Sequence, residues 1–357
     1  MTKRILTTGN EAIGYGAICA GCRHFFGYPV TPQNQCTEFF ANELPKIGGV
    51  FVQSESETAS INMVYGAAAA GVRTMTSTAS VGFSLMQEGI SHIAMAELPC
   101  VVVNVQRGGP GMGTTQTAQM DYLQVTKGGG HGGYRNIVLA PASVQECFDF
   151  IQLAFYLSDK YRNLVMVLSD GIIAEMAESV ELKTLEFGPL PQKDWALKGK
   201  AHRGGNRNFV SCSNLLTRPT RDGLRMLGEK YRKLESNEVR YESYMTEDAV
   251  FILVAYGSSS RMSKEAVDVA RAEGLKVGII RPITLWPFPY EPINSLTSRV
   301  DKFLVVEDGL EQMVEDVRCA VGKKAQVYFL GGTARHVPGP GGMIFPDRIF
   351  EEVEKLI

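Results

Sequence analysis

Strand-like apolar runs alternate with helical patterns through the first half of the chain. Between residues 25 and 170 these runs are FFGYP, VFVQ, RTMTST, CVVVNV, IVLAP and LVMVLSD. Strands separated by helices of this length pair in parallel through right-handed crossovers, so that helices cover both faces of the sheet. The pattern therefore predicts a doubly wound, parallel-sheet α/β domain over residues 1–182.

The alternation resumes after about residue 248, in AVFILVAYGS, LKVGIIRP, KFLVVED and QVYFLGG. Four strands with helical crossovers predict a second, smaller α/β domain over residues 246–357. Its first helix is expected to run from Met262 to Ala272. Just before it, the sequence Tyr256-Gly-Ser-Ser-Ser could bind an anion at a helix start, and simple N-capping by the serines is equally natural.

Residues 183–245 interrupt the alternation. Residues 183–240 contain 13 Lys and Arg against six Asp and Glu, a local net charge of +7, whereas the formal net charge of the whole chain is −2. Most charge runs of this kind are solvated surface. We therefore expect a basic connector, with a helix in RPTRDGLRMLGEKYRKLESNEVR.

Charge and hydropathy argue against two classes of partner. A formal net charge of −2 gives no reason to expect nucleic acid. No apolar run approaches membrane-spanning length, and the first residues, MTKRILTTGNEAIG, lack the apolar core of a signal peptide. We therefore expect neither a nucleic-acid nor a membrane partner, and a cytoplasmic location by default.

The cysteines do not suggest a disulfide framework, because the seven of them are scattered and odd in number. Only Cys19 and Cys22 lie close together, in a C-A-G-C sequence. A single CxxC without a second ligand pair is weak evidence for zinc or an iron–sulfur cluster, and buried reduced thiols explain it better. If the protein works with a cluster, another chain must carry it.

One βαβ unit, Val50–Gly82, places carboxylates where ligands gather. VFVQ ends a strand, SESE turns the chain, and TASINMVYGAAAAG forms a helix before the strand RTMTST. Ligands of open parallel sheets bind at the carboxyl edge, so Glu55 and Glu57 are candidates for chemistry. Ser54-x-x-Glu57 also fits a capping box, in which Glu57 only binds backbone donors. The spacing alone leaves both interpretations open.

A long glycine-rich loop, QRGGPGMGTTQTAQMDYLQVTKGGGHGGYR, follows the strand CVVVNV. Loops this long in a compact domain are usually functional or disordered. The loop lacks the lysine of a P-loop, and no dinucleotide fingerprint opens a helix, which disfavours a nicotinamide dehydrogenase. Arg107 could present two donors to a carboxylate or phosphate, or it could form a salt bridge that only pins the loop.

Several segments, in order, match one family. NEAIGYGAICAGCRHFFGYPVTPQNQ, SESETASINMVYGAAAAG, TMTSTASVGFSLMQEGISH, ELPCVVVNVQRGGPG and GGGHGGYRNIVLAPASVQE together resemble the alpha subunit of 2-oxoacid:ferredoxin oxidoreductases, with the closest resemblance to the 2-oxoisovalerate members. The resemblance covers essentially the whole chain. It implies a thiamine-diphosphate pyrimidine-type domain followed by a domain like the C-terminal one of transketolases.

The resemblance also assigns roles to three residues. Glu57-Thr-Ala through Gly66-Ala matches the family pattern of a helix-opening carboxylate, and Glu55 does not align. Glu57 would hydrogen-bond N1′ of the cofactor's aminopyrimidine and so promote removal of the proton from thiazolium C2. Thr31, in the family's YPxTP motif, and Arg107 would contact the substrate carboxylate.

The implied reaction is the oxidative decarboxylation of a 2-oxoacid with coenzyme A, which yields acyl-CoA, CO₂ and reduced ferredoxin. The resemblance favours 2-oxoisovalerate as substrate, with pyruvate and 2-oxoglutarate as alternatives. A non-catalytic α/β subunit that kept the fold is the competing hypothesis.

The metal motif of thiamine enzymes, GDG followed by Asn, is approached only by Ser169-Asp170-Gly171, and no Asn follows at the required distance. The chain should therefore bind only the pyrimidine half of the cofactor. The resemblance implies that a beta subunit supplies the diphosphate site, Mg²⁺ and a [4Fe-4S] cluster. Gamma and ferredoxin-like delta subunits are further expected partners, with ferredoxin as electron acceptor.

Overall fold

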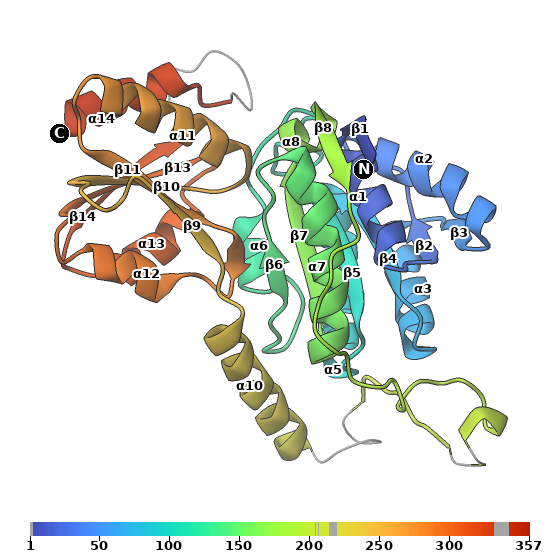
Figure 1. Ribbon diagram of the computed structural model, residues 1–357. Coiled ribbons are helices and arrows are strands. Elements are labelled where there is room, and N and C mark those ends of the chain that lie inside the picture. Colours follow the sequence, from blue (N-terminus) through green and yellow to red (C-terminus); the bar gives the residue numbers. More distant parts are fainter. Residues whose placement is uncertain (1–2, 204, 206, 214–219, 332–342) are drawn as a thin grey trace.

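The computed structural model describes residues 3–203, 205, 207–213, 220–331 and 343–357. Within these ranges the chain forms two α/β domains joined by a connector that contains a long helix (Figure 1). The described helices include none that is both long enough and apolar enough to cross a membrane.

The first domain is built on a parallel sheet. Over the described residues the strand order is β12-β6-β7-β5-β4-β2-β3, and all pairs except β12–β6 are parallel. The central strands β4, β5 and β7 are buried at every position, as expected when helices cover both faces. The strands are β2 (His24–Gly27), β3 (Val50–Gln53), β4 (Thr74–Ala79), β5 (Cys100–Gln106), β6 (Ile137–Leu139), β7 (Leu164–Asp170) and β12 (Thr284–Trp286).

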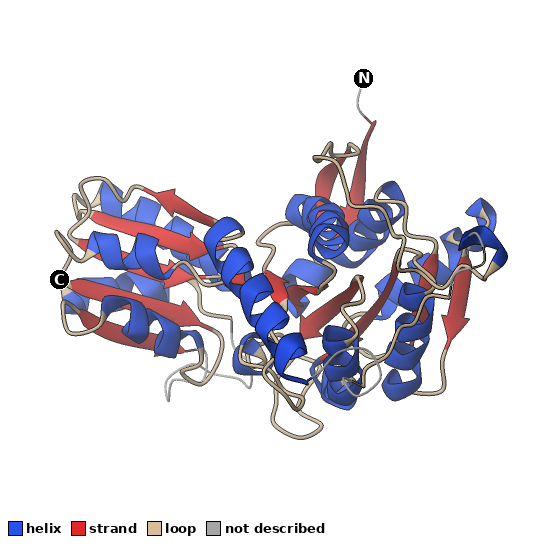
Figure 2. Cartoon of the chain, turned by 90° about the horizontal axis from the view of Figure 1, so that it is seen from below, coloured by secondary structure: helices blue, strands red, loops and turns tan. Residues whose placement is uncertain are grey.

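Helices follow the strands as the alternation predicts. The helices α1 and α7 pack together, as do α3 and α5. Figure 2 shows helices on both sides of the strands. The segment after β4 forms two helices, α4 and α5, separated at Met86. The bounds are α1 (Gly9–Cys19), α2 (Asn34–Glu43), α3 (Glu57–Ala69), α4 (Ser80–Leu85), α5 (Gln87–Met95), α6 (Tyr122–Thr126), α7 (Val144–Tyr161) and α8 (Gly171–Glu175).

Two strands lie outside the local alternation. β1 (Lys3–Thr8) and β8 (Ala177–Leu182) form a separate antiparallel pair. In the connector, α10 (Thr220–Asn237) confirms the predicted helix. β9 (Tyr241–Tyr244), which lies within the segment assigned to the connector, pairs with β11 of the second sheet.

The second domain has the strand order β14-β13-β10-β11-β9 in the described part of the chain, with the four predicted strands parallel. In Figure 1, α11 and α14 lie on one face of this sheet, and α12 and α13 lie on the other. The elements are β10 (Phe251–Ala255), α11 (Gly257–Ala272), β11 (Val277–Pro282), α12 (Tyr290–Leu296), β13 (Lys302–Glu307), α13 (Met313–Val321), β14 (Gln326–Gly331) and α14 (Pro346–Leu356).

A buried amide joins the two domains. Gln119, from the glycine-rich loop, donates through Nε2 to the carbonyl of Tyr256 at 2.9 Å. Its Oε1 accepts from Ser259 Oγ at 2.7 Å and from the amide of Asp308 at 3.1 Å. Since all of these residues are buried, the domains are held in one arrangement by specific hydrogen bonds rather than by apolar contact alone.

Replacing Asp308 with Asn tests this interface. Burial, and then the negative charge of Asp170, raises the pKa of Asp308 to about 7. In the unfolded chain the group ionises near a pKa of about 4. Between these values the folded state binds the extra proton, so stability falls as pH rises from about 4 to about 7. We expect Asp308→Asn to reduce the fall in melting temperature between about pH 5 and pH 8.

The control for this measurement is Asp301→Asn, which changes an exposed aspartate just before β13. It should leave the pH dependence of the melting temperature as in the parent chain. If Asp308→Asn also leaves it unchanged, the buried carboxyl does not contribute to the pH dependence.

Candidate active site

Glu57 is the first residue of α3, directly after the turn that follows β3. The capping box, one of the two interpretations of Ser54-x-x-Glu57, is not formed: Ser56 is the N-cap, and its Oγ accepts from the amide of Ala59 at 3.3 Å. Ser54 instead donates to the carbonyl of Gly27 at 3.2 Å and pairs with Ser60. Glu57 is only 5% exposed, and its carboxylate forms no hydrogen bond with the residues that the structure describes. It is a buried acid without a structural partner.

Gly82 makes room for that carboxylate. The Glu57 Oε1 atom lies directly over Gly82 in α4, and a Cβ at this position would overlap both Glu57 Oε1 and Thr78 Oγ1. The helix α4 follows β4, so the carboxyl ends of two neighbouring strand–helix units meet here. Any side chain at residue 82 must displace the Glu57 carboxylate or the backbone that carries it.

Arg107 follows β5 and is 8% exposed. Its Nη1 donates to the carbonyl of Thr31 at 2.9 Å, and its Nη2 donates to the carbonyl of Met112 at 2.9 Å. Nε is buried and has no partner within the described residues. The guanidinium therefore holds the loop through neutral carbonyls, and no salt bridge to it is formed in the described part of the chain.

The structure brings Thr31 and Arg107 into contact and links both to the helix beside Glu57. Ser80, the first residue of α4, accepts from the amide of Arg107 at 3.0 Å. Thr31 is half-buried, and its hydroxyl accepts from Asn34 Nδ2 at 3.3 Å. The first turn of α4 thus lies between the predicted acid and the predicted cation.

The sequence analysis did not identify two further buried polar residues at this point, Ser80 and Asp121. Ser80 Oγ donates to Asp121 Oδ2 at 2.5 Å, and Asn104 Nδ2 donates to the same oxygen at 2.9 Å. Burial raises the pKa of Asp121, and the hydrogen bonds from Ser80 and Asn104 act in the opposite direction. No periodicity or motif in the glycine-rich loop singles out Asp121, because its partners come from other strands.

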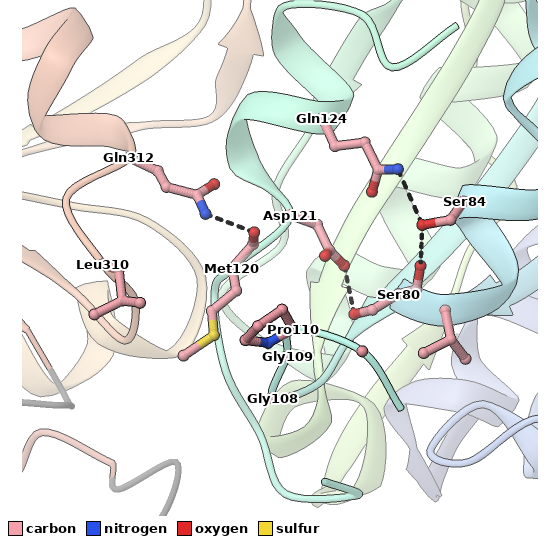
Figure 3. A pocket seen from close by; sticks show the side chains of 12 residues that line it. Ser80, Ser84, Gly108, Gly109, Pro110, Met120, Asp121, Gln124, Leu310 and Gln312 are labelled. Atoms are coloured by element: carbon pink, nitrogen blue, oxygen red, sulfur yellow. Dashed lines mark hydrogen bonds between the residues drawn. The ribbon is translucent and has the colours of Figure 1, made fainter. Parts of the chain in front are cut away.

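A cavity of about 390 Å³ opens beside this network, between the two domains. Ser80, Asp121 and Gln124 face Leu310 and Gln312 across it (Figure 3). Gln312 Nε2 donates to the carbonyl of Met120 at 2.6 Å, so both domains define the cavity wall. A small ligand in it would touch the loop that begins at Arg107.

Family models match almost the whole chain. Residues 15–245 match the model "Pyruvate flavodoxin/ferredoxin oxidoreductase, thiamine diP-bdg", and residues 249–340 match "Pyruvate:ferredoxin oxidoreductase core domain II". Ketoisovalerate oxidoreductase subunit VorB of Methanothermobacter marburgensis is 50% identical over 89% of this chain and 90% of its own length. The chain belongs to the 2-oxoacid:ferredoxin oxidoreductases, as an alpha-type subunit. The predicted family and enzyme class are confirmed.

Other comparisons agree on the family and its fold. The 2-oxoglutarate synthase subunit KorA of Methanothermobacter thermautotrophicus is 36% identical over the full length of both chains. A 2-oxoglutarate:ferredoxin oxidoreductase structure from Magnetococcus marinus, with 2-oxoglutarate, coenzyme A and succinyl-CoA bound, matches with a TM-score of 0.88 and 28% identity. The match covers 99% of the alpha-type subunit, which spans 65% of that longer chain.

A split-gene transketolase matches with a TM-score of 0.59 at 12% identity, over 97% of this chain and 95% of its own, and shows the fold alone. The predicted fold class is confirmed.

The subunit uses Asp170, the acid of its partial metal motif, to cap helices. Asp170 Oδ1 accepts from the amide of Ile173 in α8 at 3.1 Å, and Oδ2 accepts from the amide of Ser258 in α11 at 2.9 Å. The helix start at Tyr256-Gly-Ser is therefore bound by a carboxylate of the other domain, and α11 begins at Gly257 rather than at Met262. Within the described ranges, no group of three or more His, Cys, Asp and Glu side chains could hold a metal ion.

The C-A-G-C cysteines of the subunit lie apart from the site residues. Cys22 is buried and donates to the carbonyl of His24 at 3.5 Å, and burial raises the pKa of its thiol to about 12. Cys19 is half-buried, and burial also raises its pKa. Both thiols are protonated at neutral pH, which suits packing rather than ligation.

The contact between Gly82 and Glu57 predicts a stability effect. Gly82→Ala places a methyl group against two oxygen atoms, and we expect it to destabilise the subunit by about 1–3 kcal/mol. Gly228→Ala is the matched control, because a Cβ there in α10 would meet no atom within 4 Å. Urea unfolding of both variants measures the difference; equal stability of the two would contradict the proximity of Glu57 to Gly82.

Proposed function

We propose that this chain is the pyrimidine-binding alpha subunit of an enzyme that oxidatively decarboxylates a branched-chain 2-oxoacid, with coenzyme A and ferredoxin as co-substrates. The observation that carries the proposal is Glu57, a buried carboxylate without a hydrogen bond to the described chain. The residue is only 5% exposed and its carboxylate is not bonded within the described chain, so the carboxylate is available to a bound group. The competing hypothesis of a non-catalytic subunit gives this unbonded carboxylate no role.

Glu57 is proposed to hydrogen-bond N1′ of the aminopyrimidine. When bound, thiamine diphosphate supplies a nucleophilic carbon at thiazolium C2. The contribution of the chain is to hold or release a proton at N1′, since Glu57 is the buried acid at the carboxyl edge of the sheet. Gly82 supports this role because it leaves the space that the carboxylate occupies.

Arg107 and Thr31 are proposed to bind the substrate carboxylate. The guanidinium is buried and is held by two backbone carbonyls rather than by an acid, so it keeps a full charge for an anionic ligand. Thr31 contributes a hydroxyl next to it. A carboxylate held by a cation in a largely dry site is positioned for loss of CO₂.

The partner assignments are also proposals. Both oxygens of Asp170 accept from helix amides, and the described residues contain no group of three or more His, Cys, Asp and Glu side chains that could hold a metal ion. We propose that a beta subunit supplies the diphosphate site, Mg²⁺ and a [4Fe-4S] cluster, with gamma and ferredoxin-like delta subunits completing the assembly. The active site would then lie at a subunit interface.

Two observations support a branched-chain substrate. The cavity next to residues 108–111 has the apolar side chains of Val81, Met120 and Leu310 on its wall beside polar ones, and its described lining contains no Lys or Arg. A second carboxylate, as in 2-oxoglutarate, would require a second cation. The 50% identical relative is named for ketoisovalerate, whereas four relatives named for 2-oxoglutarate are 36–39% identical.

Glu57→Gln in the assembled enzyme tests the proposed function. An amide of the same length cannot exchange a proton with N1′, and loss of a positioned acid–base group slows turnover by about 10²–10⁴-fold. The KM for the 2-oxoacid should change much less than kcat, because Arg107 and Thr31 are intact. The measurement combines steady-state kinetics with NMR of C2–H exchange in the bound cofactor.

The neighbouring carboxylate provides the control. Glu55 is exposed and accepts a hydrogen bond from Ser56, so Glu55→Gln should exchange C2–H and turn over substrate as the parent enzyme does. If Glu57→Gln folds, retains cofactor and exchanges C2–H at the parent rate, Glu57 is not the acid–base group.

Substrate choice can be measured directly. We expect kcat/KM for 2-oxoisovalerate to exceed that for pyruvate, because the apolar wall gains contact with the branched side chain. It should also exceed that for 2-oxoglutarate, whose distal carboxylate would be buried without a cation. Initial rates with the three acids, under identical coenzyme A and ferredoxin concentrations, decide the order. A preference for 2-oxoglutarate would overturn the substrate proposal but not the reaction class.

A further inference from the structure

The loop that carries Arg107 is closed at its base by one hydroxyl group. The amide of Arg107, the first residue after β5, donates to Ser80 Oγ at 3.0 Å. The same Oγ donates to Asp121 Oδ2 at 2.5 Å. Residues 107 and 121 are the two ends of the segment between β5 and α6, so Ser80 joins its beginning to its end.

Asp121 is fixed by strand β5 as well as by Ser80. Asn104 Nδ2 donates to Asp121 Oδ2 at 2.9 Å, and the amide of Asp121 donates to Gln106 Oε1 at 3.1 Å. Asn104 and Gln106 are fully buried, and Asp121 is 8% exposed. The carboxylate is therefore held by Ser80 and Asn104, and the backbone amide of Asp121 by Gln106, so Asp121 has little freedom to move.

The direction of the Arg107 side chain depends on this closure. Its guanidinium is held by the carbonyls of Thr31 and Met112, and Met112 belongs to the same loop. Further contacts inside the loop keep it folded on itself: the amide of Gly108 donates to Gln116 O at 3.0 Å, and the amide of Thr114 donates to Gly108 O at 2.9 Å. If the hydrogen bonds at the base of the loop break, Met112 moves and the guanidinium loses one of its two carbonyl acceptors.

Asp121 is linked to Arg107 through the hydroxyl of Ser80, which has a different effect from a direct contact between the two side chains. A salt bridge between Asp121 and Arg107 would occupy the donors that a ligand carboxylate needs. With Ser80 between them, the negative charge still lies near the guanidinium, but the described residues leave the donors of Arg107 bonded only to neutral carbonyls. The arrangement orients Arg107 without neutralising it through a hydrogen-bonded pair.

We propose that Asp121 is a positioning residue, which acts through Ser80 to hold Arg107 in the direction that binds the carboxylate of the 2-oxoacid. This inference rests on the proposed function of Arg107. It predicts that the Asp121–Ser80 link affects binding of carboxylate-bearing substrates and not the later chemistry. It also requires a hydrogen-bond acceptor at position 121, not a negative charge.

The experiment uses the assembled enzyme with four variants, Asp121→Ala, Asp121→Asn, Ser80→Ala and the double variant Asp121→Ala/Ser80→Ala. KM and kcat are measured for 2-oxoisovalerate. The same variants are tested with 2-methylpropanal, which has the same side chain but no carboxylate. The KM for this aldehyde is compared between the variants. Where the aldehyde is not turned over, its inhibition constant is compared instead.

A matched control removes an equally buried carboxylate far from the loop. Asp159, in α7 at the opposite edge of the sheet, is 7% exposed and pairs with Arg73 at 2.8 Å. Asp159→Ala should lower the melting temperature without changing either KM.

We expect Asp121→Ala and Ser80→Ala each to raise the KM for the 2-oxoacid about tenfold, the effect of one lost positioning hydrogen bond. The double variant should be no worse than either single variant, because both break one link. Asp121→Asn should restore a KM near that of the parent enzyme, since the amide oxygen can still accept from Ser80. The aldehyde should bind equally well to all variants.

Several results would overturn the inference. Equal loss of acid and aldehyde binding in Asp121→Ala would show a general structural role, and a large fall of kcat in Asp121→Asn would show direct acid–base participation. Additive effects in the double variant would mean that the two residues act separately. If Asp121→Ala does not assemble, an unchanged KM in Ser80→Ala is sufficient to reject it. Failure of the parent enzyme to turn over any 2-oxoacid would reject the proposed function instead.

Discussion

Parallel pairing of the strands in the first sheet is the constraint on which the site depends. Thr31 follows β2, Glu57 follows β3, Ser80 follows β4, Arg107 follows β5, and Asp170 ends β7. After each of these strands the chain turns back over a face of the sheet. All five residues therefore lie at the carboxyl edge of the sheet. The register places Ala79 opposite Val105 and Gln106 opposite Asp170, which brings the strand ends level. A slip of one residue would turn the buried polar side chains into the helix layers.

The same edge carries both the candidate chemistry and the attachment of the second domain. Gln119, Asp121 and Tyr122 are close in sequence, yet Gln119 binds the start of α11, Asp121 binds Ser80, and Tyr122 donates to Asp316 of α13 at 2.6 Å. The loop that begins at Arg107 is thus fixed at its far end by the second domain. Domain docking and the orientation of Arg107 are therefore parts of one buried polar network, in which an unpaired member would be costly.

Local sequence patterns predicted the elements that depend on residues near in sequence. They missed contacts between residues that are distant in sequence. Periodicity predicted the parallel strands and most helices, but β12 and β9 were missed because each is a short edge strand that pairs antiparallel. The resemblance pointed to Glu57, Thr31 and Arg107, whose roles stay proposals. Ser54-x-x-Glu57 has the spacing of a capping box, but Ser56, two residues nearer to the helix, is the N-cap, and Ser54 donates to the carbonyl of Gly27. Asp121 was missed since Ser80 is 41 residues away.

Asp170 belongs to a partial metal motif, but in this chain its carboxylate caps helices. In the sequence Ser169-Asp170-Gly171 the acid stands at the end of a buried strand, where a thiamine enzyme with a complete motif would place a metal ligand. Here its two oxygens start two helices, one in each domain, and both amide donors would be left unpaired if the carboxylate turned toward a metal. The acid therefore serves the joint between the domains. The proposal that Glu57 and Arg107 contribute to a thiamine site therefore includes a second chain for the metal half.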